Sequence, residues 1–288
     1  MEYRNLEGIT ADTIVPVFNR AFSDYQVPMT MTPGDLASMM AGRGYCGAVS
    51  VGAFDSENLV GFILNGLRDR HGSLTFYDIG TGIVPEYQGR GIATSMIAYA
   101  KELMDRIGAG CYLLEVLQEN ASAVKLYQRN QFVIVRELIC YRMNRPEGEP
   151  DENAGLCGGE TLEPFFRESG AAVTAMWDVC PSWQHSAESI VAGAGEYAWK
   201  AVYDSQGLAG YGVINMLSGR LAQLAVRPDV RRQGLGRRLL RDLSAAADDR
   251  QISAVNVDSN GRNVIPFLIC QGFEEYVRQY EMEYRKQP

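Results

Sequence analysis

A glycine-containing segment in the first half of the chain has the residue types of a phosphate-binding loop. It reads Gln88, Gly89, Arg90, Gly91, Ile92 and Ala93, between a predicted strand and a predicted amphipathic helix. Glycines let the backbone approach a ligand closely, and the N-terminus of the helix presents unpaired N–H groups with a partial positive charge. Arg90 could add a charge-assisted contact. The segment predicts a cradle for a pyrophosphate, although a tight turn without a ligand explains the glycines equally well when they are taken alone.

Two familiar phosphate loops do not fit this segment. The chain has no GxxxxGK[ST] sequence, which excludes a Walker A loop. A Rossmann GxGxxG/A also fails, because Gly89-Arg90-Gly91-Ile92-Ala93 continues with Thr94. The Gly80-Thr81-Gly82 stretch fails in the same way, because Pro85 occupies its sixth place.

A second loop of the same kind lies in the second half of the chain. It reads Arg231, Arg232, Gln233, Gly234, Leu235 and Gly236, and Arg231 stands 143 positions after Gln88. Phe273 follows Phe132 at an offset of 141 positions. Two matches in the same order at nearly one offset indicate a duplicated domain. A degenerate copy can keep such a turn for folding alone, and this remains the alternative for the second loop.

The linked motifs resemble those of the GNAT (GCN5-related N-acetyltransferase) superfamily. In that family Q/R-x-x-G-x-G/A after a strand is followed, some thirty residues later, by N-x-x-A-x-x-L-Y. The first copy matches at Gln88, Gly91, Ala93, Asn120, Ala123, Leu126, Tyr127 and Phe132, and departs at Gln131, where the family has Gly. The second copy matches at Arg231, Gly234, Gly236, Gly272 and Phe273. The departure at Gln131 concerns the exit from a helix and so the local geometry more than the chemistry.

The resemblance implies both a fold and a reaction. The fold is α/β (α+β), a mixed sheet flanked by helices, in two tandem acyl-CoA N-acyltransferase domains. The reaction transfers an acetyl group from acetyl-CoA to a primary amine of a small molecule or peptide, by direct attack in a ternary complex. The implied CoA contacts are the two loops together with Ile83, Val84, Asn120 and Val226. Tyr127 is the implied general acid, since a phenol stays protonated at pH 7, and Asp78 is the implied base.

Each of these side chains also has a structural explanation. Tyr127 could be a buried tyrosine that only packs, Asp78 a solvated strand residue, and Asn120 a helix N-cap. In the second copy Leu268 occupies the tyrosine place, and the stretch 219–225 has no Asp or Glu. We therefore expect the first copy to be catalytic and the second to be degenerate. Two alternatives remain open, namely catalysis in the C-terminal copy and a non-catalytic CoA-responsive regulatory module.

The predicted domains are 1–145, an acidic linker at 146–160, and 161–288. Periodicity predicts the first-copy helices at 12–22, from 32 onward, at 91–107 and at 121–130, with Asp12 capping the first and Thr32 the second. Strands are predicted at 3–6, 48–54, 59–67, 74–84, 112–116 and 132–142. In the second copy the predicted order is strands 199–204, 207–215 and 221–226, helix 234–248, strand 254–257, helix 264–270 and strand 273–284.

Composition limits the classes of partner. The net charge is −8 and the pI about 5.0, which disfavours nucleic acid and favours cationic acceptors. The six cysteines are scattered and there are two histidines, so we expect no metal site. No apolar run of membrane-spanning length and no apolar leader are seen, so we expect a cytoplasmic protein without membrane contact. A pseudo-dimer of the two copies and the oligomeric state are left open.

Overall fold

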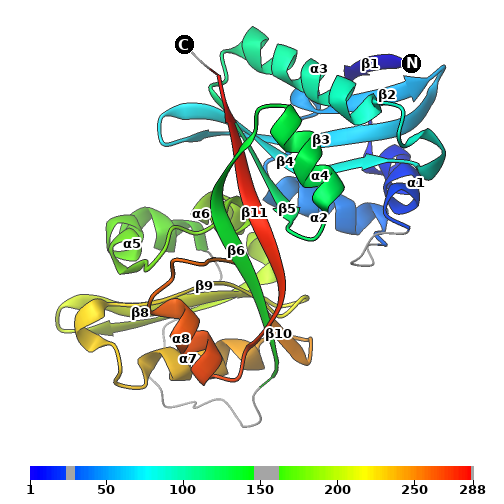
Figure 1. Ribbon diagram of the computed structural model, residues 1–288. Coiled ribbons are helices and arrows are strands. Elements are labelled where there is room, and N and C mark those ends of the chain that lie inside the picture. The colour runs from blue at the N-terminus through cyan, green and yellow to red at the C-terminus, as the bar shows by residue number, and fades with distance from the viewer. Residues whose placement is uncertain (24–29, 146–161, 287–288) are drawn as a thin grey trace. The chain divides into compact units, whose positions relative to one another are not determined.

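The computed structural model describes residues 1–23, 30–145 and 162–286. The chain divides into two compact units. Unit 1 comprises Met1–Val135 with Tyr280–Pro288, and unit 2 comprises Arg136–Gln279. The predicted linker 146–160 lies outside the described residues. Each unit is a mixed sheet with helices on both faces (Figure 1), and the predicted fold class is thereby confirmed.

Unit 1 follows the order that periodicity predicts. Its elements are β1 (Glu2–Asn5), α1 (Ala11–Ala21), α2 (Pro33–Gly42), β2 (Val51–Asp55), β3 (Asn58–Arg70), β4 (Ser73–Ile83), α3 (Ile92–Ile107), β5 (Cys111–Leu117), α4 (Ala121–Arg129) and the start of β6 (Val133–Asn144). Strands β1 to β4 pair antiparallel, and β5 pairs parallel to β4. Helix α3 packs on one face of this sheet, and α1 and α2 lie on the other (Figure 1).

Unit 2 repeats this plan. Its elements are α5 (Leu162–Met176), α6 (Ala187–Ala192), β7 (Tyr197–Asp204), β8 (Gly207–Asn215), β9 (Arg220–Val226), α7 (Leu235–Ala245), β10 (Gln251–Asp258), α8 (Val264–Cys270) and most of β11 (Glu274–Arg285). Strands β7, β8 and β9 pair antiparallel, and β10 pairs parallel to β9. Helices α5 and α6, at 162–176 and 187–192, are additions to the sequence prediction.

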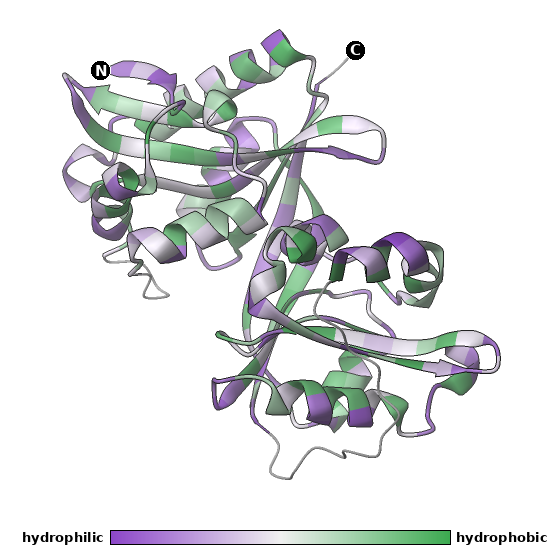
Figure 2. Ribbon diagram, turned by 180° about the vertical axis from the view of Figure 1, so that it is seen from behind, coloured by the Kyte–Doolittle hydropathy of each residue, from purple (hydrophilic) through white to green (hydrophobic). Residues whose placement is uncertain are grey.

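Burial follows the expected pattern in both units. The strands are largely apolar, whereas the helices carry apolar and polar faces (Figure 2). In unit 1 Met96 and Ala100 of α3 are fully buried against Tyr112 of β5. Their spacing of four residues places both side chains on the same helix face, so the predicted amphipathic helix covers the sheet.

Of the two predicted helix N-caps, that of α2 is confirmed and that of α1 is not. Thr32 caps α2 as expected, because its hydroxyl accepts a hydrogen bond from the Asp35 N–H at 3.2 Å, and the Asp35 carboxylate accepts one from the Thr32 N–H at 2.9 Å. The prediction that Asp12 caps α1 is wrong. The N-cap is Thr10, whose side chain makes no capping hydrogen bond, and Asp12 lies in the first turn. A carboxylate there still favours the helix through the macrodipole.

The first strand after α2 is shorter than predicted. The prediction was a strand over 48–54, but residues Gly47–Val49 form a 3-10 turn and β2 begins at Val51. The turn is held by the buried Ser50, whose hydroxyl donates to the Cys46 carbonyl at 2.8 Å. A side chain that bonds its own local backbone competes with strand pairing, which explains the shorter strand.

The last strands of the two copies are exchanged between the units. Residues 138–144 of β6 pair antiparallel with β10, inside unit 2. In return, β11 is the hydrogen-bonded neighbour of β5, and its end from Tyr280 belongs to unit 1. Met282 is fully buried in the unit 1 core, and the Lys286 N–H donates to the Gly110 carbonyl at 3.1 Å. Each copy therefore supplies the strand that completes the sheet of the other.

The exchange predicts that a second-copy side chain stabilises unit 1. Met282→Ala removes a fully buried side chain from the unit 1 core and should lower its free energy of unfolding by about 2–5 kcal/mol. Hydrogen exchange of the β5 amides, followed by mass spectrometry, should accelerate accordingly. Glu274→Ala, an exposed change at the start of the same strand, is the control. Unaltered exchange in β5 would contradict this assignment of the strand.

Candidate active site

The candidate site lies where two parallel strands of unit 1 separate. Strands β4 and β5 pair from Thr75 to Tyr77, opposite Cys111 to Leu113. On its other side β4 contains a bulge, because Asp78 pairs with Asn65 and Gly80 with Leu64, leaving Ile79 as the extra residue. A bulge bends its strand and redirects the neighbouring side chains. Asp78 therefore stands at a fork between the strands.

Asp78 is a buried carboxyl with two hydroxyl donors. It is 9% exposed, and its Oδ2 accepts hydrogen bonds from Thr81 Oγ1 at 2.6 Å and from the Tyr127 hydroxyl at 3.3 Å. Burial raises the pKa of Asp78 from 3.8 to about 6, and the hydrogen bonds from Thr81, Tyr127 and the Gly80 N–H oppose that rise in part. A carboxyl with a pKa near 6 is ionised at pH 7 and is a stronger base than an exposed aspartate.

Tyr127 reaches Asp78 from helix α4. It is 8% exposed, and its ring packs edge-on against Phe132, with 5.6 Å between the ring centroids. This packing restricts the ring and aims the hydroxyl at the fork. The sequence offered Tyr127 and Asp78 as separate candidates, and the structure places them in direct hydrogen-bond contact.

Behind this pair lies a buried polar network that the sequence analysis missed. Asn65 is fully buried, its amide donates to the Val49 carbonyl at 2.7 Å, and its Oδ1 accepts from the Tyr112 hydroxyl at 2.7 Å. The Asn65 N–H donates to Ser50 Oγ at 2.8 Å. Because Asn65 is the register partner of Asp78, the network fixes the strand opposite the bulge. A polar Asn amid the apolar run of β3 was the available signal.

The first loop is held by its own side chain. Gln88 Nε2 donates to the Ile83 carbonyl at 3.0 Å, which ties the loop to the end of β4. Gly89 and Gly91 have φ of +73° and +77°, and a Cβ at either would meet nothing within 4 Å. Glycine is thus required here by backbone conformation, and the space outside the loop is open. Gly91 is the N-cap of α3, so the first N–H groups of that helix face the loop.

The remaining predicted contacts of the first copy differ in accessibility. The side chains of Val84 and Ile92 belong to the unit 1 core, so only their backbone groups can reach a ligand. Asn120 caps α4, since its Oδ1 accepts from the Ala123 N–H at 3.1 Å. The Arg90 guanidinium lies 5.0 Å from the centre of the Tyr87 ring. Ile83 and Ala93 are half-buried at the two ends of the loop.

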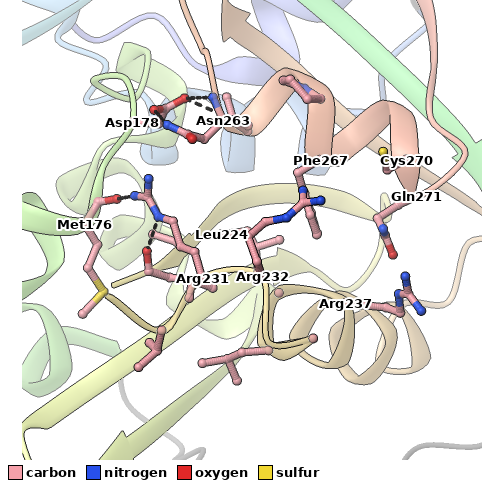
Figure 3. A pocket seen from close by; sticks show the side chains of 18 of the residues that line it. Met176, Asp178, Leu224, Arg231, Arg232, Arg237, Asn263, Phe267, Cys270 and Gln271 are labelled. Atoms are coloured by element: carbon pink, nitrogen blue, oxygen red, sulfur yellow. Dashed lines mark hydrogen bonds between the residues drawn. The ribbon is translucent and has the colours of Figure 1, made fainter. Parts of the chain in front are cut away.

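The second loop has the same local design. Arg231 Nε donates to the Val226 carbonyl at 2.8 Å, the counterpart of the bond from Gln88 to Ile83 (Figure 3). A further bond joins Arg231 to the Met176 carbonyl at 3.0 Å. Gly234, with φ +86°, is the N-cap of α7. The first loop position is Gln in one copy and Arg in the other because both side chains carry an N–H donor. Each is long enough to reach the backbone carbonyl of the residue five positions earlier.

Beside this loop unit 2 contains a cavity of about 460 Å³, which we call the arginine-lined cavity (Figure 3). Its lining includes five residues of the predicted set, Val226, Arg231, Gly234, Leu235 and Gly236, and three further arginines, Arg232, Arg237 and Arg262. Gln233 of the predicted set is exposed and lies outside this lining. Among the described residues Arg232, Arg237 and Arg262 form no ion pair. The acidic lining residue Asp178 accepts hydrogen bonds from the N–H groups of Asn263 and Val264, at the start of α8. The surplus positive charge suits a ligand with several phosphate charges.

Leucines stand in unit 2 at the places of Asp78 and Tyr127. Strand β9 has the same bulge, with Leu221 opposite Ile214 and Gln223 opposite Val213, so Leu221 occupies the register place of Asp78. Leu268 of α8 occupies the place of Tyr127, and both leucines belong to one buried core cluster. Both Asp78 and Tyr127 are therefore replaced in unit 2, by apolar side chains that cannot transfer protons.

Within the described residues the structure contains neither a metal-binding cluster nor a membrane-crossing helix. No group of three or more His, Cys, Asp or Glu side chains within residues 1–23, 30–145 and 162–286 is arranged to hold a metal ion. In the same part of the chain, none of the helices has the length and apolarity needed to cross a membrane.

The duplicated fork, loop and helix define a family. The chain belongs to the GNAT acetyltransferases, since the Acetyltransferase (GNAT) family matches residues 16–132 and the Acetyltransferase (GNAT) domain matches residues 167–284. It is a tandem member with two such domains, as the sequence motifs predicted.

Particular relatives cover the chain to different extents. N-alpha-acetyltransferase 30 of Schizosaccharomyces pombe is 31% identical over 94 residues, which are 32% of this chain and 62% of that protein. The tRNA(Met) cytidine acetyltransferase TmcA of Aeropyrum pernix is 39% identical over 70 residues, 24% of this chain and 9% of that one. The chain thus spans less than two thirds of both curated relatives. A tandem GNAT protein from the clavulanic acid biosynthesis pathway has the same fold, with a TM-score of 0.72, 15% identity, and coverage of 100% of this chain and 99% of its own.

Burial of Asp78 predicts a stability that depends on pH. Because its pKa of about 6 in the folded protein exceeds the ordinary 3.8, the folded state holds this proton more tightly than the unfolded chain. The resulting stabilisation is complete below about pH 4 and is lost as the pH rises through about 6. Asp78→Asn cannot ionise, so at pH 7.5 its free energy of unfolding should exceed that of the wild type by roughly 1–3 kcal/mol.

Urea denaturation at pH 4 and pH 7.5 measures this difference. The two proteins should have similar stability at pH 4 and separate at pH 7.5. Asp248→Asn, which changes an exposed carboxyl, is the control. A variant that is less stable than wild type at pH 7.5 would show that the hydrogen bonds to the carboxylate outweigh its burial.

Proposed function

We propose that the first copy transfers an acetyl group from acetyl-CoA to a primary amine of a small molecule or peptide, and that the second copy binds CoA without transferring it. The hydrogen-bonded pair Asp78–Tyr127 at the fork of unit 1 carries this proposal. Leucines replace both members in unit 2, which retains the loop and has the arginine-lined cavity beside it. The net charge of −8 favours a cationic acceptor.

The pair supports a complete proton cycle. The neutral amine attacks the thioester carbonyl, and Asp78 takes a proton from the nitrogen as the C–N bond forms. The C–S bond then breaks, and Tyr127 donates its phenolic proton to the sulfur, which gives CoA thiol and the amide. Asp78 returns its proton to the Tyr127 phenolate through their hydrogen bond. No proton is gained or lost by the enzyme over one turnover.

The residues of the loop give CoA its place in unit 1. Gly89 and Gly91 leave open space over the N-terminus of α3, where backbone N–H groups favour a pyrophosphate. Arg90 adds a positive charge at the edge of this cradle. Backbone groups of the bulge in β4 lie at the fork, where donors can polarise the thioester carbonyl.

Removing the phenol should slow the chemistry rather than the binding. Tyr127→Phe should lower kcat by about 10²–10⁴-fold with little change in the KM for acetyl-CoA, because it deletes a proton donor and keeps the ring. The assay follows thiol release with a panel of polyamines, aminoglycosides and peptides with free N-termini. Tyr99→Phe, on the half-buried face of α3, is the matched control. Unchanged turnover in Tyr127→Phe would exclude Tyr127 as the acid and direct attention to unit 2.

The base should appear in the pH profile. Since Asp78 acts as its carboxylate, kcat/KM should fall as the pH drops through about 6, the pKa of that carboxyl. This limb should be absent from the residual activity of Asp78→Asn. The double variant with Tyr127→Phe should lose little more than either single variant, because the two groups act as one unit. Strictly multiplicative losses would contradict that coupling.

CoA binding to the first copy can be distinguished from CoA binding to the second with a matched pair of substitutions. Gly91→Asp and Gly234→Asp each place a carboxylate on one cradle, at an N-cap where a Cβ meets no atom within 4 Å. Both residues have positive φ, so Gly91→Asn and Gly234→Asn, which strain the backbone in the same way without adding a charge, are the controls. Calorimetry should show two CoA equivalents for the wild type and one for each Asp variant. Gly91→Asp should also abolish turnover. If CoA binds at both sites but no amine on the panel reacts, a CoA-responsive regulatory module becomes the better conclusion.

A further inference from the structure

A second cavity in unit 2 adjoins the arginine-lined cavity. Its volume is about 110 Å³, and we call it the acyl chamber. Strands β9 and β10, helix α8 and the segment 177–185 form its walls. Leu221 and Leu268, which stand where unit 1 has its acid–base pair, both line it. The two cavities share Asp178, Leu224 and Phe267 among their lining residues, so the chamber continues from the arginine-lined cavity.

A fixed chain of hydrogen bonds forms one wall of the acyl chamber. Trp177 Nε1 donates to the Tyr211 hydroxyl at 2.8 Å, and that hydroxyl donates to Gln223 Oε1 at 2.6 Å. Gln223 Nε2 in turn donates to the His185 carbonyl at 2.6 Å. These bonds lock the buried side chains of Tyr211 and Gln223 in place, so this wall is rigid.

Ser182 also belongs to this lining, and its hydroxyl is not part of the hydrogen-bond chain. The residue is 1% exposed, and its Oγ is buried with no hydrogen-bond partner in the described part of the chain. A buried hydroxyl without a partner costs free energy, and such groups are normally satisfied. A hydroxyl can both donate and accept, so it suits a ligand group with an oxygen atom.

The size of the chamber limits what can enter. A cavity of roughly 150 Å³ takes up benzene, which has six heavy atoms, so about 110 Å³ has room for about four or five. Apolar side chains of Leu221, Ala222 and Leu268 suit a short carbon chain. Ser182 suits a hydroxyl or oxo group on that chain. Neither leucine can take or give a proton.

We propose that the second copy holds a short acyl thioester of CoA whose four-carbon, hydroxyl- or oxo-bearing acyl group occupies the acyl chamber and is bound without being transferred. This inference rests on the proposed CoA site of the second copy. The arginine-lined cavity binds the phosphates, and the chamber selects the acyl group through Ser182. The second copy would thereby respond to the kind of thioester present, and not to CoA alone.

The test uses the full chain with Gly91→Asp, which leaves the second copy as the CoA site. Calorimetry compares 3-hydroxybutyryl-CoA, butyryl-CoA and free CoA. The hydroxylated thioester should bind about tenfold more tightly than butyryl-CoA, because butyryl-CoA leaves Ser182 without a partner. Adding Ser182→Ala should bring the two thioesters to within about twofold and leave the affinity for free CoA unchanged.

Controls separate this inference from the function on which it rests. Ser244→Ala removes another buried serine hydroxyl, one bonded within α7 at 2.7 Å, and should keep the tenfold preference. Binding of free CoA with equal affinities for both thioesters would overturn the acyl chamber alone. No binding of any of the three ligands would overturn the CoA site of the second copy as well. Thiol release from 3-hydroxybutyryl-CoA in the presence of the amine panel would overturn binding without transfer.

Discussion

Two parallel strands that cease to pair inside a sheet impose the main constraint on this structure. A sheet normally satisfies its own backbone groups, and a fork within it creates a position where donors and acceptors must find other partners. In unit 1 the bulge at Ile79 and the network around Asn65 hold β4 in this diverging course. The loop that follows is anchored by Gln88 to the end of the same strand. The glycine loop and the Asp78–Tyr127 pair are therefore both held in place through β4.

The two copies use one framework with opposite energetics at its centre. Unit 1 buries a carboxyl whose raised pKa reflects an unfavourable environment for its charge. Unit 2 fills the same places with Leu221 and Leu268, which gain free energy from burial. The buried carboxyl at the fork therefore lowers the stability of unit 1, whereas the leucines at the same places raise the stability of unit 2. Both leucines line the smaller of the two cavities of unit 2.

Much of this architecture could be predicted from the sequence. The glycine loops, the amphipathic helices and the order of strands follow from patterns of neighbouring residues, and Thr32 was correctly predicted as the N-cap of α2. Asn65 and Ser182 were missed because their importance comes from burial beside groups distant in the sequence. The contact between Asp78 and Tyr127, 49 positions apart, needs the fork as well as the motif. The exchange of β6 and β11 is invisible to periodicity, since alternation specifies a strand but not its partner.

Because the last strands are exchanged, the sheet and core of each unit depend on a strand from the other copy. During synthesis the core of unit 1 lacks Met282 until β11 has been made, because that residue follows the whole of unit 2 in the sequence. A deletion of the second copy would remove this strand along with the rest, so unit 1 would lose part of its own interior. Selection that preserves the fold of either copy therefore also retains the other. Strand exchange between duplicated domains thus makes the loss of either half costly.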